Sequence, residues 1–461
     1  MSSRKTPWLW VPTLYFAEGI PFFIVNVVSV TMFKRMGMGN ADLAMYTSLL
    51  YLPWVIKPLW SPLVDVVRSK RWWILMMQAL MTVCFAAIAL GLPSSPGAPV
   101  GAFGLCLVLF YITAMLSATH DIAADGYYML ALDEHQQSLF VGIRSTFYRI
   151  ASVFGQGVIV VIAGLLETRY GDIPRAWRVT LLASAALFLI ITIWHQFILP
   201  AGRPAATGKG PAICGGSAPK SPAAPDLPTS PQSGSVPVSA VHAEACSEPT
   251  RSFLSAFATF FRKPGVGLAM IFMLLYRLPE ALSVKMLTPF LLDPVDAGGL
   301  GLTTAQSGLV YGTVGVIALT VGGILGGVWS ARVGLRKALW PMALALALPC
   351  AVYLYMALAQ PSNLLTVYFC VALDQFGYGF GFTAYMLYMM YFSQGEYSTS
   401  HYAVCTAFMA LSMMIPGFFA GMLQESLGYT GFFVLVMACC LATIAVTALL
   451  PSRIDPTYGR K

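Results

Sequence analysis

The chain has 461 residues, of which 57% are hydrophobic and only 10% are charged. An ordinary soluble domain carries roughly 25% charged residues, so this composition excludes a soluble globular protein and indicates a chain that faces lipid. The net charge of +8 is not gathered on one soluble face, which argues against nucleic acid as a partner. The cysteines show neither a disulfide framework nor a metal-ligand spacing, and we expect no cofactor and no metal.

Apolar segments of helical length recur along the chain, and a bilayer-spanning helix needs roughly 20 apolar residues. Six begin near residues 8, 42, 72, 101, 145 and 177, and six more begin near 265, 303, 338, 364, 400 and 430. The segment between the two sets is rich in Pro, Ala, Gly and Ser and cannot bury a core. The sequence therefore predicts an all-α membrane protein of twelve helices: an N-terminal half (1–199), a disordered linker (200–256), a C-terminal half (257–452) and a tail (453–461).

The distribution of basic residues predicts the orientation. Most Lys and Arg residues outside the spans fall on the side of the termini and the linker. The opposite side holds only Lys34, Arg35, Arg169, Arg175 and Arg178. Because basic loops stay in the cytoplasm, we expect both termini and the linker to be cytoplasmic, in a bacterial inner membrane. We expect a monomer.

A short loop follows the second span of each half: 61–71 (SPLVDVVRSKR) and 327–337 (GVWSARVGLRK). Both resemble the loop that marks the major facilitator superfamily, Gly-x-Leu-x-Asp-Arg-x-Gly-Arg-Arg. Asp65, helped by Lys70 or Arg71, is a candidate charge latch that holds one gate shut against the other half. Arg336 is a corresponding base in the second loop. The alternative is that Lys70 and Arg71 only fix the topology.

Ionisable groups at membrane depth are the most informative feature, because they are costly unless they face protein or water. Nearly all lie on the first, fourth, seventh and tenth spans, which line the central cavity of a major facilitator fold. They are Glu18; His120, Asp121 and Asp125; Arg277, Glu280 and Lys285; and Asp374. Lys57 and Arg149 are exceptions. Counted along the helices, Arg149 is level with Asp125, so we expect it to pair with Asp121 or Asp125 and hold the N-terminal half together.

Two of these carboxylates lie beside helix-breaking prolines: Glu18 is followed by Pro21, and Pro279 precedes Glu280. Broken helices in corresponding spans of two halves point to a binding site at mid-membrane. A carboxyl in a partly dry cavity can exchange between protonated and charged forms, which makes Glu18 and Glu280 candidate proton carriers. Asp121, Asp125 and Asp374 are further candidates for proton coupling. The alternatives are that Glu280 is permanently paired with Arg277 and that Glu18 is structural.

Polar and aromatic residues on the same helices are candidates for solute contact, because rings stack on planar groups while hydroxyls form hydrogen bonds. Taken singly, each tyrosine is more often a packing residue or an interface anchor. The candidates are Tyr15, His120, Tyr127, Tyr276, Arg277, Lys285, Gln375, Tyr378 and Tyr385.

The fourth span, Ser117-Ala-Thr-His-Asp121-Ile-Ala-Ala-Asp125-Gly126-Tyr127, resembles the Ser-x-x-Gln-Asp-Ile-Ala-x-Asp-Gly/Ala-Trp/Tyr signature of the AmpG muropeptide permeases and the related acetyl-CoA transporters. The likeness continues through Tyr148-Arg149 and Leu275-Tyr276-Arg277. His120 replaces the usual Gln, and Glu18 lies where such sequences tend to be uncharged. The resemblance implies a twelve-helix major facilitator fold that imports a bulky polar solute, a cell-wall disaccharide or anhydromuropeptide, with protons.

Three functions remain open on the sequence alone. The first is proton-coupled import of a muropeptide-like solute. The second is import of a siderophore or another carboxylate, with Arg277 and Lys285 as anion partners. The third, from another class, is a membrane sensor that signals through its linker. An enzyme is not expected, because no nucleophile–base pair lies at cavity depth.

Overall fold

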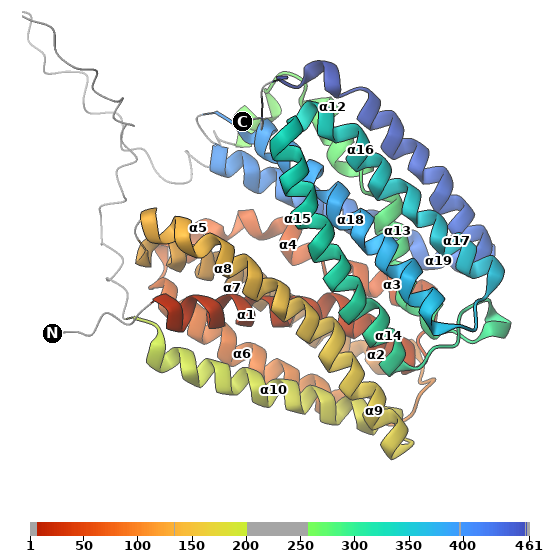
Figure 1. Cartoon of the computed structure of the whole chain (residues 1–461). Coiled ribbons are helices and arrows are strands. Elements are labelled where there is room, and N and C mark those ends of the chain that lie inside the picture. The colour runs from red at the N-terminus through yellow and green to blue at the C-terminus, as the bar shows by residue number, and fades with distance from the viewer. Residues whose placement is uncertain (1–6, 133, 201–256, 396–397, 457, 459–461) are drawn as a thin grey trace, which may run out of the picture.

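The computed structural model describes residues 7–132, 134–200, 257–395, 398–456 and 458, which form helices and turns without a strand (Figure 1). The N-terminal half consists of α1 (Pro7–Phe23), η1 (Ile24–Val28), α2 (Ser29–Arg35), α3 (Asn40–Leu49), α4 (Leu52–Ile56), η2 (Lys57–Leu59), α5 (Ser61–Val66), α6 (Lys70–Gly91), η3 (Val100–Phe103), α7 (Gly104–Ala131), α8 (Glu134–Val153), η4 (Phe154–Ile159), α9 (Val160–Tyr170) and α10 (Ile173–Ile198). The C-terminal half consists of α12 (Val266–Leu275), α13 (Leu278–Leu292), η5 (Val295–Ala297), α14 (Thr304–Ser307), η6 (Gly308–Gly315), α15 (Val316–Val333), α16 (Leu335–Ala347), η7 (Leu348–Cys350), α17 (Ala351–Ala359), α18 (Leu364–Ser393), α19 (Ser398–Ala448) and η8 (Pro451–Arg453). Residues 201–256 of the predicted linker lie outside the described residues.

Nine helical stretches of the described residues are long and apolar enough to cross a membrane. One of them holds two spans, because Gly428 adopts φ 68° and ψ 173° inside α19 and breaks it. The stretch from α3 to α5, interrupted by turns, and the polar, aromatic-rich α18 supply the remaining two. The twelve predicted spans are therefore accounted for.

The fifth predicted span, which comprises α8, η4 and α9, differs from the prediction at its start. It begins at Glu134 rather than near residue 145. Residues 134–144 read EHQQSLFVGIR, a polar and amphipathic sequence that a search for apolar runs passes over. The extra turns place Arg144 inside a helix instead of in a loop, which matters for the site below.

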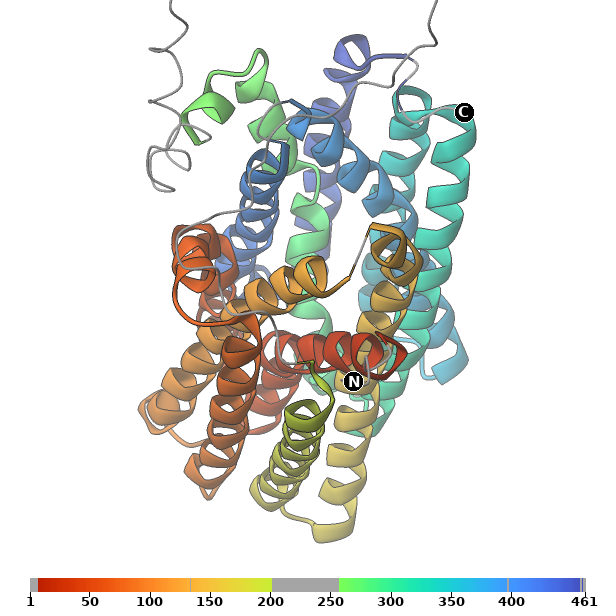
Figure 2. The same ribbon diagram turned by 90° about the vertical axis from the view of Figure 1, so that its left-hand side faces the viewer.

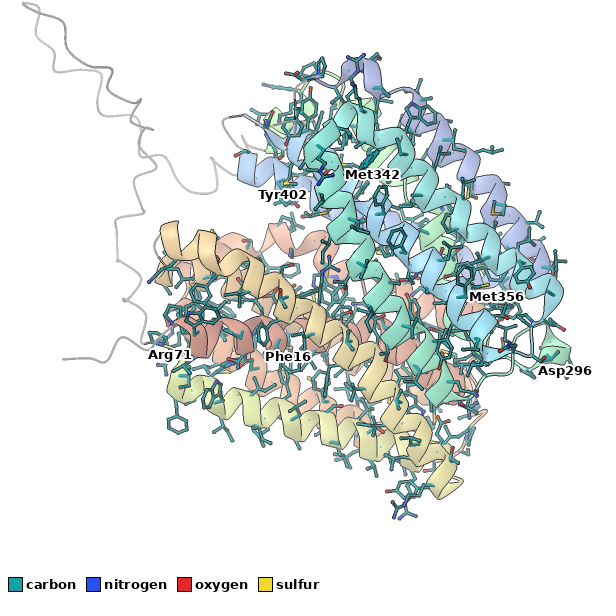
Figure 3. All side chains as sticks on the ribbon, viewed as in Figure 1. Phe16, Arg71, Asp296, Met342, Met356 and Tyr402 are labelled. Atoms are coloured by element: carbon teal, nitrogen blue, oxygen red, sulfur yellow. The ribbon has the colours of Figure 1, made fainter. Side chains whose placement is uncertain are left out.

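The two halves lie side by side and at an angle (Figures 1 and 2). They diverge at what we call the linker end, where α1 begins, α5 meets α6 and α10 ends. They converge at what we call the far end, where α2 meets α3 and α13 ends. Arg71 and Asp296 mark the linker end and the far end (Figure 3). Buried aromatic and aliphatic side chains fill the interior of each half.

Hydrogen bonds and ion pairs that join described residues of the two halves lie at the far end or at mid-span. Lys34 Nζ pairs with Asp293 Oδ1 at 2.5 Å. Asn40 Nδ2 donates to Gln424 Oε1 at 2.7 Å, and Thr304 Oγ1 donates to Glu167 Oε2 at 2.6 Å. The far end is thus closed by polar contacts between the halves.

Close approach of the halves also requires glycine. A Cβ at Gly312 would overlap the backbone oxygen of Gln156, and a Cβ at Gly421 would overlap that of Asn40. Small residues let membrane helices approach closely, so that dispersion contacts hold them together where lipid gives no hydrophobic driving force. Gly312 lies in the π-helical segment η6, which faces the π-helical segment η4 of the other half.

We predict that Gly312→Ala weakens the closed far end, because the added methyl must separate η4 from η6. Overpacking of this kind costs about 1–3 kcal/mol and should lower the melting temperature of the purified protein. The control is Gly327→Ala in the same span, where a Cβ meets nothing within 4 Å; it should leave the melting temperature unchanged or raise it, because Ala is the better helix former. Equal melting temperatures for both variants would contradict the packing account.

Candidate functional site

The N-terminal half carries a charged cluster around Asp125 of α7. Arg144 of α8 donates to Asp125 Oδ1 at 2.8 Å, and the hydroxyl of Tyr15 on α1 donates to the same oxygen at 3.1 Å. The Arg144 guanidinium also lies over the Tyr15 ring, 4.4 Å from its centroid. α7 and α8 are joined by a very short turn, so residues a few turns from that junction on either helix come level. The cluster ties three helices together.

Glu18 and Asp121 lie beside this cluster and are less completely bonded. Glu18 on α1 is buried, and its Oε2 has no hydrogen-bond partner. Asp121 Oδ2 accepts from the indole of Trp54 at 2.9 Å, whereas its buried Oδ1 has no partner. A buried polar atom without a partner is costly. Each of these two carboxyls therefore keeps an oxygen that no described residue satisfies.

The C-terminal half carries a second charged cluster at the break between α12 and α13. Arg277 lies in this break, just before the Leu278-Pro279 start of α13. Its Nε and Nη2 donate to the two oxygens of Glu280 at 2.8 and 2.7 Å, and Nη2 also donates to the Tyr378 hydroxyl at 2.9 Å. Both members of the pair are buried. The pair with Arg277 that was the alternative to a proton-carrying Glu280 is formed, and it is bidentate.

Asp374 and Gln375 lie on α18, in the interior of the C-terminal half. Asp374 Oδ2 accepts from the Tyr353 hydroxyl at 2.5 Å and from Gln375 Nε2 at 3.0 Å. Asp374 is thus hydrogen-bonded within its own half, in contrast to Glu18. The prediction that it takes part in proton coupling is not tested by this arrangement.

A pocket lies between the two halves at mid-span. The N-terminal half contributes η1, α2 and Tyr51, and the C-terminal half contributes α13, η6 and α19. The lining residues are Asn26, Val27, Val30, Tyr51, Ala281, Val284, Lys285, Thr288, Tyr311 and Met413. Two of the lining segments, η1 and η6, are π-helical, a distortion frequent at functional sites. Of the predicted solute-contacting residues, the pocket contains Lys285.

Four other predicted solute contacts lie inside one half, away from this pocket. His120 Nε2 and Gln78 Nε2 are 3.0 Å apart in the N-terminal half. The hydroxyls of Tyr127, Tyr276 and Tyr385 donate to the backbone oxygens of Pro200, Gly381 and Met273. A tyrosine on a cavity-lining helix can face its own bundle as readily as the cavity. In these three tyrosines the hydroxyl bonds to a neighbouring backbone oxygen.

The predicted ion pair of Arg149 with Asp121 or Asp125 is wrong. Asp125 pairs with Arg144, and an Nη atom of Arg149 lies beside Gly323 of α15, in the other half. The depth argument places both arginines near the right level, but it ignores direction around the helix. Five residues turn an α-helix by about 140° beyond a full turn, so Arg144 and Arg149 face different neighbours.

Of the predicted gate residues at the linker end, the structure describes the side chains of Lys70, Arg71 and Arg336. The side chain of Asp65 lies outside the described residues, so its latch remains a prediction. Lys70 is buried and packs along Gly126 of α7. Arg71 donates to the Gln196 backbone oxygen of α10 at 2.6 Å, within its own half. Arg336 is exposed.

Sequence reasoning missed the gate at the far end. Lys34 was counted only as a topology signal, yet it pairs with Asp293 across the two halves. Asp293 Oδ2 also accepts from the Tyr429 hydroxyl at 2.6 Å. One signal was present: Lys34 ends the first span and Asp293 ends the seventh, which are corresponding positions in the two halves.

Comparison with known proteins supports the resemblance. A model of the Major Facilitator Superfamily matches residues 13–400. A "Putative transporter AmpG 4" of Rickettsia conorii (strain ATCC VR-613 / Malish 7) is 21% identical over 449 residues, which cover 95% of each chain. The anhydromuropeptide permease of Escherichia coli (strain K12) is 24% identical over 435 residues, which cover 93% of this chain and 76% of the relative.

Solved structures of transporters share the fold. A bacterial homolog of the human lysosomal transporter Spinster, in an inward-facing and unoccupied conformation, matches with a TM-score of 0.70 at 13% identity over 98% of both chains. A D-xylose–proton symporter matches with a TM-score of 0.68 at 12% identity, also over 98% of both chains. The chain therefore belongs to the Major Facilitator Superfamily, is similar to its AmpG permeases over most of its length, and is a multi-span secondary transporter of a small-molecule solute rather than an enzyme.

Proposed function

We propose that this transporter imports a bulky polar solute of the muropeptide class together with protons, as a monomer with both termini in the cytoplasm. The observation that carries the proposal is the buried Glu18, which forms no ion pair among the described residues and lies beside the Asp121 and Asp125 carboxyls. The solute class is supported by the relatives, which include an anhydromuropeptide permease.

Glu18 is suited to carry the proton. An ionised carboxylate is costly at membrane depth, whereas a protonated one is neutral. Asp121 and Asp125 oppose its negative charge, and Arg144 and Lys57 favour it. Because these groups come from four helices, a movement of the helices changes the balance and can release or capture a proton.

Glu280 has a different role in this proposal. Its two oxygens are both held by Arg277, and removing one partner of a buried ion pair leaves an uncompensated charge that costs about 3–5 kcal/mol. Glu280 therefore serves as the counter-ion of Arg277. A Glu280→Gln variant should lose stability and transport together, whereas loss of Glu18 should affect coupling alone.

The orientation of the protein in the membrane follows from the distribution of basic residues together with the closed far end. If the linker end is cytoplasmic, as the basic residues predict, the halves are closed toward the outside and the structure is inward-facing. Lys34–Asp293, Asn40–Gln424 and Glu167–Thr304 then form the outer gate. This gate must open for solute to enter from outside, so its contacts are the ones that the transport cycle breaks.

We predict that Glu18→Gln abolishes proton-driven accumulation of a labelled anhydromuropeptide in proteoliposomes but preserves exchange of labelled for unlabelled solute. Glutamine keeps the size of the side chain and cannot release a proton, so the carrier still turns over while coupling is lost. Asp296→Asn is the control, because Asp296 is exposed at the far end (Figure 3); it should accumulate solute as the wild type does. Accumulation by Glu18→Gln that still follows the proton gradient would refute this role.

A second prediction concerns the outer gate. Asp293→Asn keeps the hydrogen bonds to Tyr429 and Asn40 but removes the charge that pairs with Lys34. A charge-assisted hydrogen bond contributes about 1.5–3 kcal/mol, so the outward-open population should rise roughly tenfold or more. The readout is labelling of Val30→Cys, which lines the pocket, by a membrane-impermeant maleimide added outside cells, in a background without the native cysteines.

Asp296→Asn, three residues away, again serves as the control and should label at the wild-type rate. Faster labelling of Asp293→Asn from outside supports both the gate and the orientation. If the variant labels no faster than the control, the ion pair does not close the outer gate.

A further inference from the structure

The pocket between the halves contains a buried lysine whose charge is not balanced by a carboxylate of the described residues. Lys285 of α13 is 7% exposed, and among the described residues it forms no ion pair. The other buried or half-buried cations of the two clusters and the outer gate each have a carboxylate: Arg277 has Glu280, Arg144 has Asp125 and Lys34 has Asp293. Lys285 is the exception.

The hydrogen bonding of Lys285 leaves most of its ammonium group unused. Its Nζ donates to Thr47 Oγ1 at 2.9 Å, and that hydroxyl donates its own hydrogen to the backbone oxygen of Leu43 at 2.6 Å. Thr47 is from the other half, so the bond also bridges the halves. An ammonium group has three N–H donors, and one of them is accounted for here. The remaining donors have no acceptor among the described residues.

The position of Lys285 is fixed by its neighbours. Its Nζ lies 5.7 Å from the centroid of the Tyr51 ring. Its stem passes Gly417 of α19, where a Cβ would lie 3.2 Å from the Lys285 Cε and 2.7 Å from Ser48 Oγ. The side chain is therefore directed into the pocket rather than toward lipid.

Other polar atoms of the pocket are also unbonded. Asn26 Nδ2 donates to the Phe22 backbone oxygen, but Asn26 Oδ1 is buried without a partner. Tyr51 and Tyr311 line the same pocket, and neither hydroxyl is bonded to another described residue. Lys285, Tyr51, Tyr311 and Asn26 thus line one space between the halves. A carboxylate with a neighbouring N–H or O–H group would satisfy this set.

We propose that Lys285 binds a carboxylate of the transported solute in this pocket and makes the transporter selective for anionic solutes. The inference rests on the proposed function, because a muropeptide carries carboxylates on its lactyl group or peptide, but it adds the group that is recognised and the residue that recognises it. A charged hydrogen bond between Lys285 and the solute would also compete with the Lys285–Thr47 bridge, so solute binding would loosen a contact between the halves.

The test is calorimetric binding of N-acetylmuramic acid and of its carboxamide to purified protein, since the two compounds differ only in the lactyl group, which is a carboxylate in one and an uncharged amide in the other. Wild type should bind the acid at least tenfold more tightly than the amide. Lys285→Met should bind both with equal, weak affinity, and Lys285→Arg should keep part of the preference. Lys337→Met, which changes an exposed lysine of α16, is the matched control and should behave as wild type. Melting temperatures identify variants that fail to fold.

The outcomes separate this inference from the proposed function. A Lys285→Met variant that retains the wild-type preference overturns it, as does a folded wild type that binds acid and amide alike or binds neither. Proton-driven uptake of anhydromuropeptide by the same preparation, without a preference for the acid, would leave the proposed function standing and refute the carboxylate site. A Lys285-dependent preference without proton-driven uptake would support the carboxylate site and refute the proposed function.

Discussion

The free-energy cost of a charge at membrane depth shapes this structure more than any other constraint. Each half meets it with an Arg–carboxylate pair supported by tyrosine: Arg144 with Asp125, and Arg277 with Glu280. These pairs are internal to one half and can persist while the halves move. Glu18 and Lys285 are two buried ionisable groups that form no ion pair among the described residues, and Lys285 lines the pocket between the halves. In the two proposals above, a proton compensates the charge of Glu18 and a solute carboxylate compensates the charge of Lys285.

The contacts between the halves follow the same principle. Polar bonds hold the halves together at the far end, and glycines allow their backbones to touch. These contacts need no solute between the halves. A transporter must exchange such contacts for others during its cycle. Single bonds such as Lys34–Asp293 suit that requirement, because each is strong enough to bias the equilibrium and weak enough to break. Lys285 bonds to Thr47 across the same boundary, so the proposed solute binding at Lys285 would link the pocket to the separation of the halves.

The sequence predicted the fold well and the site only in part. Apolar length, basic loops and the fourth-span motif lead to twelve helices in two halves, because membrane spans must be long and apolar whatever their neighbours are. The Arg277–Glu280 pair was foreseeable, because both residues lie on one short stretch. Contacts between distant helices were not, because depth along a helix can be counted whereas direction around it cannot when helices are bent and partly π-helical; Arg144, not Arg149, therefore pairs with Asp125. For the same reason the sequence could not show that the hydroxyl of Tyr276, a candidate solute contact, bonds to a backbone oxygen within its own half.

The central claim is that Glu18 gains or loses a proton as solute binds. The most direct measurement is the pH change of a weakly buffered solution of purified protein when an anhydromuropeptide is added. Wild type should show a proton uptake or release that scales with the amount of solute bound, and Glu18→Gln should bind solute without it. An equal proton signal from both proteins would contradict the account.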